Sequence, residues 1–286
     1  LMDHIGEFFP DSPIWFRWLG RLAAPLFFYA LAVGFQHTRN RKKYLLRLYL
    51  ANVGMVFFNQ IMCMLQRKLD YVAYQPKNHN IFTTLFCAGV LICIWENRKE
   101  KKKFFTYIGI YIFWQAMVMG LAILAEAFDY VWRGNALLQT VLRTNYIFPL
   151  LGGIWDAEGG VFFIVLGVWL YCAVENKWKL ALRYILFCGA YMFMCQGDIL
   201  YRIMSRFSFW GYHKLADVIY FGSSFVGIPL GTSDLSLLTE FYQWMMIGAL
   251  PIMLSCNGKR GKSLKWLFYA AYPLQFLVLY GISYYK

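Results

Sequence analysis

Long apolar runs recur along the chain and constrain its fold more than any other feature of the sequence. A helix that crosses a ~30 Å hydrocarbon core needs ~20 mostly apolar residues. Hydrophobic residues make up 60% of the chain and aromatic residues 20%, a composition typical of membrane proteins. The runs therefore predict an all-α, polytopic helical membrane protein. Its eight expected spans are 16–35, 44–65, 81–95, 104–125, 160–173, 180–201, 241–254 and 264–284.

The loops between these runs alternate in charge. Four basic loops hold 15 of the 28 lysines and arginines, whereas the intervening loops carry most of the acidic residues. The basic loops are 39–43, 98–103, 177–179 and 259–265. Because positively charged loops stay in the cytoplasm, the pattern predicts eight spans with the C-terminus outside, and a ninth span upstream of Leu1.

The net charge of +13 arises from these short loops and forms no continuous stripe. Nucleic-acid-binding proteins concentrate basic residues on one face or along one helix. We therefore interpret the charge as a topology signal and expect no nucleic-acid partner. No linker divides the chain, so we expect one membrane domain over 1–286.

Two arginines lie in the first apolar run. Arg17 and Arg21 are one helical turn apart and share a face. An arginine at the centre of a membrane helix costs roughly 2.5 to 3.5 kcal/mol, which favours a position facing the interior of the bundle. The alternative is snorkelling, in which both side chains reach the lipid headgroups.

Two outer connections are longer than simple turns. The piece 146–155 is apolar but too short to span, and 205–240 mixes aromatic residues with glycine and serine. Both are typical of re-entrant segments, whose backbone needs protein or water partners; interfacial packing is the alternative. The seven cysteines lack CxxC spacing, so we interpret them as buried small side chains and expect no metal site.

Several short motifs resemble the TraX family of membrane proteins. The resemblance is dense over positions 1–85 and sparse afterwards. Its residues are Asp3-His4-Ile5-Gly6, Phe16-Arg17, Gly20-Arg21, Pro25, Gly34, His37-Thr38-Arg39-Asn40, Lys43-Tyr44, Arg47, 80–85, Asp156, Gly159-Gly160-Val161, Phe268-Tyr269 and Tyr272-Pro273-Leu274.

The resemblance implies an activity. The family is named for a conjugation protein that acetylates the N-terminus of pilin, and it is similar to multi-pass acyltransferases that use acyl-CoA and an intramembrane histidine. An acetyltransferase of the cytoplasmic membrane is therefore expected, with acetyl-CoA or another acyl-CoA as co-substrate and membrane lipids around it. Val33 and Gln275 depart from the family's usual residues. The acceptor is left open as a peptide, a glycan or a small molecule.

Acyl transfer needs a base with a pKa near the working pH, and histidine meets this requirement. We predict His4 as the general base, with Asp3 next to it in the chain. Arg21 is predicted to keep the imidazole neutral and to stabilise the oxyanion. Adjacent helical residues point ~100° apart, so a more distant carboxylate such as Asp156 is an alternative partner for His4.

The other three histidines fit other roles. His79 and His213 lie in polar outer loops and are interpreted as surface residues. His37 ends the first predicted span, at the membrane face opposite His4, and is predicted to bind the donor's phosphate end. The reversed assignment, in which His37 is the base at the cytoplasmic face, stays open.

Cations beside His37 have the charge that the phosphates of coenzyme A require. Polybasic loops also anchor topology and touch anionic lipids, and helix capping also explains Asn80. The residues assigned to donor binding are Arg17, His37, Arg39, Arg41, Lys42, Lys43, Asn80 and Thr83.

A transporter or lipid-handling protein without covalent chemistry is the rival hypothesis. Broken spans and intramembrane arginines would serve such a protein as well. However, the sequence contains no evident inverted repeat and few acidic residues within its spans.

Overall fold

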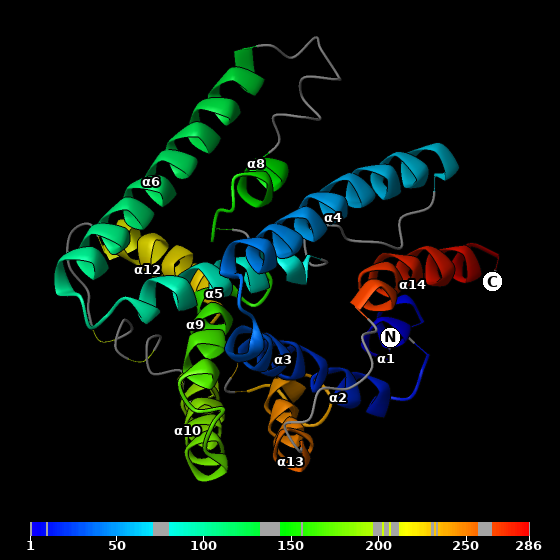
Figure 1. Cartoon of the computed structure of the whole chain (residues 1–286). Helices are drawn as coiled ribbons and strands as arrows, with labels where there is room; N and C mark the ends of the chain where they lie inside the picture. The colour runs from blue at the N-terminus through cyan, green and yellow to red at the C-terminus, as the bar shows by residue number, and fades with distance from the viewer. Residues whose placement is uncertain are drawn as a thin grey trace.

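The computed structural model describes residues 2–9, 11–70, 80–131, 144–155, 157–196, 202, 206, 212–229, 232, 234–256 and 265–285. Every secondary-structure element in these ranges is a helix (Figure 1), which confirms the all-α class. The elements are α1 (Met2–Phe8), α2 (Trp15–Gly20), α3 (Ala23–His37), α4 (Arg41–Leu69), α5 (Ile81–Glu96), α6 (Lys101–Val131), α8 (Thr144–Leu150), α9 (Gly160–Tyr171), α10 (Lys177–Gln196), α12 (Tyr212–Val226), η2 (Tyr242–Gly248), α13 (Ala249–Ser255) and α14 (Lys265–Tyr285).

Four helices are long and apolar enough to cross a membrane, counted over the described residues. They are Trp15–His37, Arg41–Gln66, Lys101–Ala125 and Lys177–Gln196, the first of which joins α2 to α3. The shorter apolar helices α5 and α9 pack against each other, and α5 also packs on α4. Ten of the 16 residues of α5 are buried, so protein surrounds this helix. Each of the eight predicted spans contains helix, although 241–254 is split between η2 and α13.

The first predicted span is interrupted. A turn at Arg21 and Leu22 separates α2 from α3. Pro25 stands in the first turn of α3, where its missing N–H removes no intrahelical hydrogen bond. Gly20 lets α1 pack directly on α2, because a Cβ at this position would clash with the Asp3 side chain. The short helix α2 thus brings both arginines against α1.

The short apolar piece predicted at 146–155 forms α8 and a turn-rich stretch between α4 and α6 (Figure 1). Side chains of α4 and α6 donate hydrogen bonds to four successive backbone carbonyls there. The contacts are Asn52 Nδ2 to Pro149 O (2.6 Å), Tyr49 OH to Leu150 O (2.8 Å), Trp114 Nε1 to Leu151 O (2.9 Å) and Gln115 Nε2 to Gly152 O (3.2 Å). The Ile154 N–H also donates to Gln115 Oε1, at 3.0 Å.

These contacts satisfy carbonyls at the end of α8 and in the turn that follows it, deep inside the bundle. Asn52 lies about three helical turns after Arg41, the start of α4, and Gln115 lies about four turns after Lys101, the start of α6. At ~1.5 Å per residue, the contacts are about 16 to 21 Å from those helix starts. This depth is near the middle of a ~30 Å core, where irregular backbone is tolerated only with protein or water partners. We interpret 144–155 as a re-entrant segment.

Replacing Asn52 by leucine tests this interpretation. The side chain of Asn52 is fully buried. Asn52→Leu removes its hydrogen bond to the Pro149 carbonyl, which keeps the bond from the Gly152 N–H, and it removes the acceptor of two donors, Asn80 Nδ2 and Thr83 Oγ1. Each unsatisfied buried group costs about 1 to 3 kcal/mol. We expect a clear fall in the melting temperature of the detergent-solubilised protein. Thr106→Val is the matched control, because this exposed hydroxyl donates only to Lys102 O of its own helix; an equal fall in both variants would contradict the interpretation.

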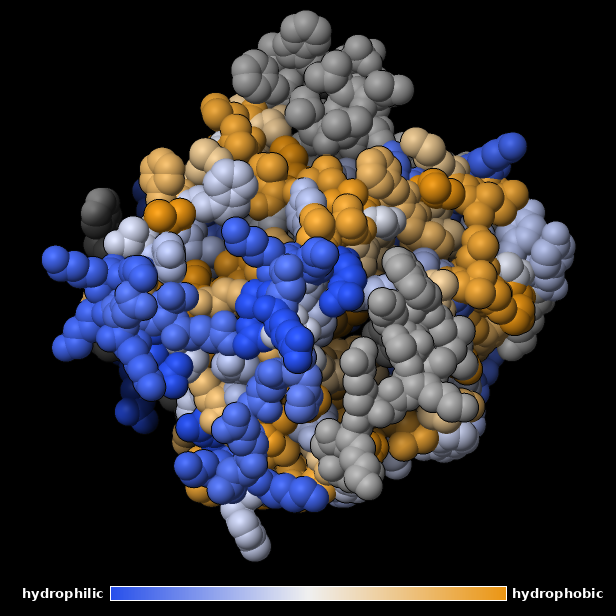
Figure 2. All heavy atoms as spheres, viewed as in Figure 1, coloured by the Kyte–Doolittle hydropathy of each residue, from blue (hydrophilic) through white to orange (hydrophobic). Residues whose placement is uncertain are grey.

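The helix ends beside the basic loops share one face. Arg41, at the start of α4, forms a salt bridge of 2.8 Å with Glu96, at the end of α5. The Tyr171 hydroxyl, at the end of α9, donates to the same carboxylate at 2.6 Å, and Lys177 Nζ donates to Leu254 O at 2.8 Å. Figure 2 shows hydrophilic side chains gathered over the starts of α4 and α6. The charge alternation predicts this common face; the loop residues 259–264 lie outside the described residues.

Candidate functional site

His4 lies on α1, where this helix packs against α14 (Figure 1). Its ring meets the Phe276 ring edge-on at a centroid distance of 4.3 Å, and Tyr272 lies 6.4 Å away. His4 Nδ1 is 3.5 Å from Glu7 Oε2, one turn further along α1. The imidazole thus combines an aromatic wall with a nearby carboxylate, the setting of a group that accepts a proton. Asp156, the alternative partner, lies outside the described residues.

Asp3 does not pair with His4. Its carboxylate contacts Arg21 Nη2 through both oxygens, and its Oδ1 lies 3.3 Å from Arg17 Nη1. Both arginines therefore point towards α1 and have a protein partner there, as a position facing the interior of the bundle requires. The structure brings Asp3, His4, Arg17 and Arg21 together, and it assigns Asp3 to the arginines and Glu7 to the histidine.

The arginines also bind η2, which is distant from them in the sequence. Arg17 Nε donates to Tyr242 OH at 2.9 Å, and Arg21 Nη1 donates to Gln243 Oε1 at 3.0 Å. Both guanidinium carbons lie over the Tyr242 ring, 5.7 and 5.4 Å from its centroid. Arg21 Nε is buried and makes no hydrogen bond within the described residues. One N–H of this side chain therefore has no hydrogen-bond partner among the described residues.

A further carboxylate borders this group of residues. Tyr272 OH lies 3.5 Å from Glu158 Oε2, and the Glu158 carbonyl accepts a hydrogen bond from Thr84 at 3.0 Å. Glu158 is also within electrostatic range of Arg21. It follows the re-entrant segment directly, so the fold of 144–155 determines where this charge lies. We call Asp3, His4, Glu7, Arg17, Arg21, Glu158, Tyr242, Gln243 and Tyr272 the charged centre.

Four members of the charged centre were not predicted from the sequence. They are Glu7, Glu158, Tyr242 and Gln243. One feature of the sequence could have indicated Glu158, because it is an acidic residue between a predicted re-entrant segment and a predicted span. No such feature indicated Tyr242 or Gln243, since no local pattern predicts contacts with residues so far away in the chain.

The residues predicted to bind the donor fall into three separate places: the turn from α3 to α4, the interior at Asn80 and Thr83, and the charged centre, where Arg17 contacts Asp3 and Tyr242. His37, Arg39, Lys42 and Lys43 are exposed around the turn from α3 to α4. The stretch of helix from Arg21 to His37 measures about 24 Å along its axis. The structure therefore keeps His37 apart from His4, as the sequence predicts.

Arg41, in contrast, has protein partners. Besides its salt bridge with Glu96, its Nη1 donates to the carbonyls of Phe35 and Thr38 at the end of α3. Its guanidinium also lies over the Phe35 ring, 5.6 Å from the centroid. Arg41 thus holds the turn that presents its neighbours and has little capacity left for a phosphate.

Asn80 and Thr83 face the interior. Asn80 Nδ2 and Thr83 Oγ1 both donate to Asn52 Oδ1, at 2.8 and 2.7 Å. Asn80 occupies the N-cap position of α5, but its side chain makes no capping hydrogen bond, so the capping interpretation is wrong. Both side chains help to hold the re-entrant segment, and their assignment to the donor has no support from these contacts.

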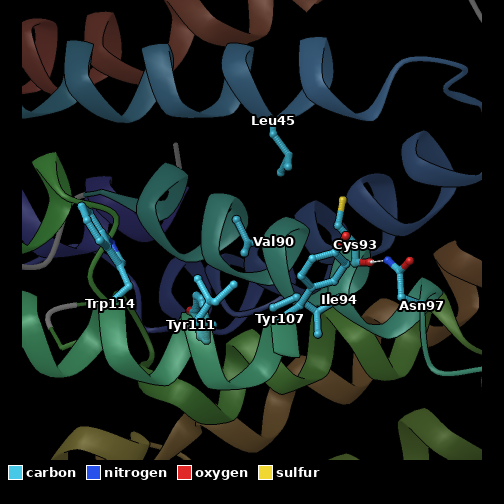
Figure 3. Close-up of a pocket in the computed structure, with 9 residues that line it drawn as sticks. Leu45, Val90, Cys93, Ile94, Asn97, Tyr107, Tyr111 and Trp114 are labelled. Atoms are coloured by element: carbon cyan, nitrogen blue, oxygen red, sulfur yellow. Dashed lines mark hydrogen bonds between the residues drawn. The ribbon is translucent and has the colours of Figure 1, made fainter. Parts of the chain in front are cut away.

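A separate cavity of about 390 Å³ lies between α4, α5 and α6, towards the face of the basic loops (Figure 3). Its walls are almost entirely apolar and aromatic. In the described part of the chain, no group of three or more His, Cys, Asp or Glu side chains is placed to hold a metal ion.

The fold and the charged centre define a helical membrane protein in which α1 places a histidine against α14 and, together with η2, holds a compensated arginine pair. The chain belongs to the TraX family, because the family model described as TraX protein matches residues 1–191. The match includes His4, both arginines and the turn at Arg41; Tyr242 and Tyr272 lie beyond it. No curated protein and no solved structure matches the chain.

Replacing Asp3 by asparagine tests the charge balance. Asp3→Asn removes the carboxylate between two arginines whose side chains are only 25% and 22% exposed. Breaking such a largely buried pair costs about 3 kcal/mol, so thermal unfolding in detergent should begin at a clearly lower temperature. In the control Glu100→Gln, the lost pair with Lys103 is more than half exposed and the melting temperature should not change. Equal melting temperatures for Asp3→Asn and the parent would contradict the arrangement.

Proposed function

We propose that this protein is an integral membrane acyltransferase. It moves an acetyl or other short acyl group from acyl-CoA to an amine or hydroxyl acceptor on the outer side of the membrane. One observation carries the proposal. A histidine with a nearby carboxylate follows Asp3, which holds an arginine with one N–H that makes no hydrogen bond within the described residues, and exposed cations lie at the other end of α3. Membership of the TraX family supports the same activity.

The charged centre supplies the groups that acyl transfer needs. Neutral His4 accepts the proton of the acceptor N–H or O–H while the acceptor's lone pair attacks the thioester carbonyl. The negative charge that develops on the carbonyl oxygen is stabilised by the Arg21 Nε–H. Collapse of the tetrahedral intermediate breaks the carbon–sulfur bond, and the imidazolium returns its proton to the leaving thiolate. Glu7 favours the imidazolium form during this sequence.

The arginines are prepared for this role before any substrate binds. Asp3 and Gln243 fix the two Nη atoms of Arg21, so its remaining N–H has a defined direction. A donor that is oriented in advance costs no reorganisation during the reaction. The bidentate pairing with Asp3 also offsets the cost of holding a guanidinium inside the bundle.

The donor's phosphates are assigned to Arg39, Lys42 and Lys43. These side chains are exposed, whereas Arg41 is held by Glu96. An extended donor then keeps its nucleotide at the cytoplasmic face and carries its acyl group towards His4. The rival function is transport without covalent chemistry. It would use the charged centre and the exposed cations in the same way but would yield no acylated product.

The two histidines should differ in kinetic effect. His4→Ala should lower the transfer rate roughly a hundredfold or more at saturating donor, the usual scale for a positioned base. His37→Ala should chiefly raise the donor's KM, because His37 lies at the phosphate end. Acyl transfer is measured with radiolabelled acetyl-CoA and a nucleophilic acceptor, with folding checked by gel filtration. Full turnover in His4→Ala together with its loss in His37→Ala would assign the chemistry to the cytoplasmic face.

The exposed cations can be tested separately. Replacing Arg39, Lys42 and Lys43 together by glutamine should weaken acetyl-CoA binding and flatten its salt dependence, since charge-assisted phosphate contacts are lost. Isothermal titration in detergent measures both quantities. In the control, Lys177 and Lys179 of another basic loop are replaced by glutamine. This variant should bind acetyl-CoA with the parent affinity. An unchanged affinity in the triple variant would reduce this turn to a topology signal.

A further inference from the structure

The cavity between α4, α5 and α6 is a groove whose two ends differ. Figure 3 shows Leu45 on α4 pointing towards α5, with Tyr107, Tyr111 and Trp114 along α6 below. Its polar end is at Asn97, next to the basic loop 98–103. Its far end is closed where Trp114 Nε1 donates to the carbonyl of Leu151 in the re-entrant segment.

Cations surround the polar end. On α6, Lys103 lies one turn before Tyr107, and on α4, Lys42 lies one turn before Leu45, so each cation shares a helix face with a residue that lines the groove. Arg98 follows Asn97 directly. Of the nearby acids, Glu96 is bound to Arg41 and Glu100 to Lys103. The groove is therefore an apolar channel with a net positive mouth.

The wall that α6 contributes is open towards the membrane. Tyr107, Ile110 and Trp114 line the groove and are 42%, 59% and 39% exposed. They belong to the candidate span Lys101–Ala125, so their exposed surfaces face hydrocarbon. A hydrocarbon chain of the bilayer can enter the groove sideways without crossing water.

The length of the groove matches one leaflet. The stretch of α6 from Lys103 to Trp114 covers about three turns, or about 16 Å along the helix. Half of a ~30 Å hydrocarbon core is ~15 Å. A chain that begins at the cytoplasmic headgroups would therefore end at the re-entrant segment.

We propose that this groove is a binding site for one anionic phospholipid of the cytoplasmic leaflet, with an acyl chain along α5 and its phosphate at Arg98 and Lys103. The bound chain fills the space beside the re-entrant segment and covers the apolar residues that line α5. This site is independent of the acyl-transfer chemistry proposed above, because Arg98 and Lys103 are not among the cations assigned to the donor and the bound lipid does not react.

Native mass spectrometry of the detergent-solubilised protein tests the proposal. The protein is titrated with dioleoyl phosphatidylglycerol or with dioleoyl phosphatidylcholine, which have the same chains and differ in headgroup charge. We expect one phosphatidylglycerol to bind roughly tenfold more tightly than phosphatidylcholine, since each basic residue near an anionic headgroup adds to the attraction. Equal binding of the two lipids would overturn the proposal.

Two variants on α6 separate the groove from the general lipid surface. Ile110→Trp fills the groove from an exposed position that tolerates a larger side chain, and it should abolish the bound lipid. Ile112→Trp is the matched control, because Ile112 is 61% exposed on the same helix and does not line the groove. Equal retention of lipid by both variants would show that the lipid binds elsewhere.

The headgroup contact is tested by replacing Arg98 and Lys103 with glutamine. This variant should still bind a lipid but lose the preference for phosphatidylglycerol. Acetyl-CoA is added to the parent complex as a competitor. Retention of the lipid is expected, whereas its displacement would assign the groove to the acyl donor and overturn the lipid site. Transfer activity is not needed for any of these measurements.

Discussion

Backbone groups inside a membrane must find partners within the protein, and this requirement organises the centre of the structure. The carbonyls from Pro149 to Gly152 are satisfied by side chains of α4 and α6. Because this stretch is anchored on both sides, the residues after it have a fixed path to α9. Glu158 contacts Tyr272 and Thr84 shortly after that stretch, so the hydrogen bonds that hold the carbonyls from Pro149 to Gly152 help to place one acid of the charged centre.

A second requirement, compensation of charge, shapes the N-terminal part. Two arginines in an apolar helix need an acidic partner, and Asp3 contacts both of them. This contact brings α1 so close to α2 that only a glycine fits at position 20. His4, the next residue, is thereby directed towards Phe276. The position of the proposed base thus depends on the pairing of its neighbour.

The sequence predicted what depends on local pattern. Apolar runs predicted the helices, the intramembrane arginines predicted an inward face, and the shortness of 146–155 predicted a segment that does not span. Partners that meet only through folding could not be predicted: Gln243 is 222 residues from Arg21, and no periodicity links them. Arg41 was assigned to the donor because its charge resembles that of its neighbours. Contacts formed on folding distinguish it: Glu96, placed by the packing of α5 on α4, and the carbonyls at the end of α3.

The two kinds of basic residue in this chain therefore have different physical roles. Arg17, Arg21 and Arg41 are arginines with several fixed protein partners each, and a planar guanidinium suits such multiple contacts. Most of the exposed cations at the basic face are lysines. The compact, mobile ammonium group of a lysine suits phosphate or headgroup binding. This division separates the side chains that hold the bundle together from those that remain available at its surface.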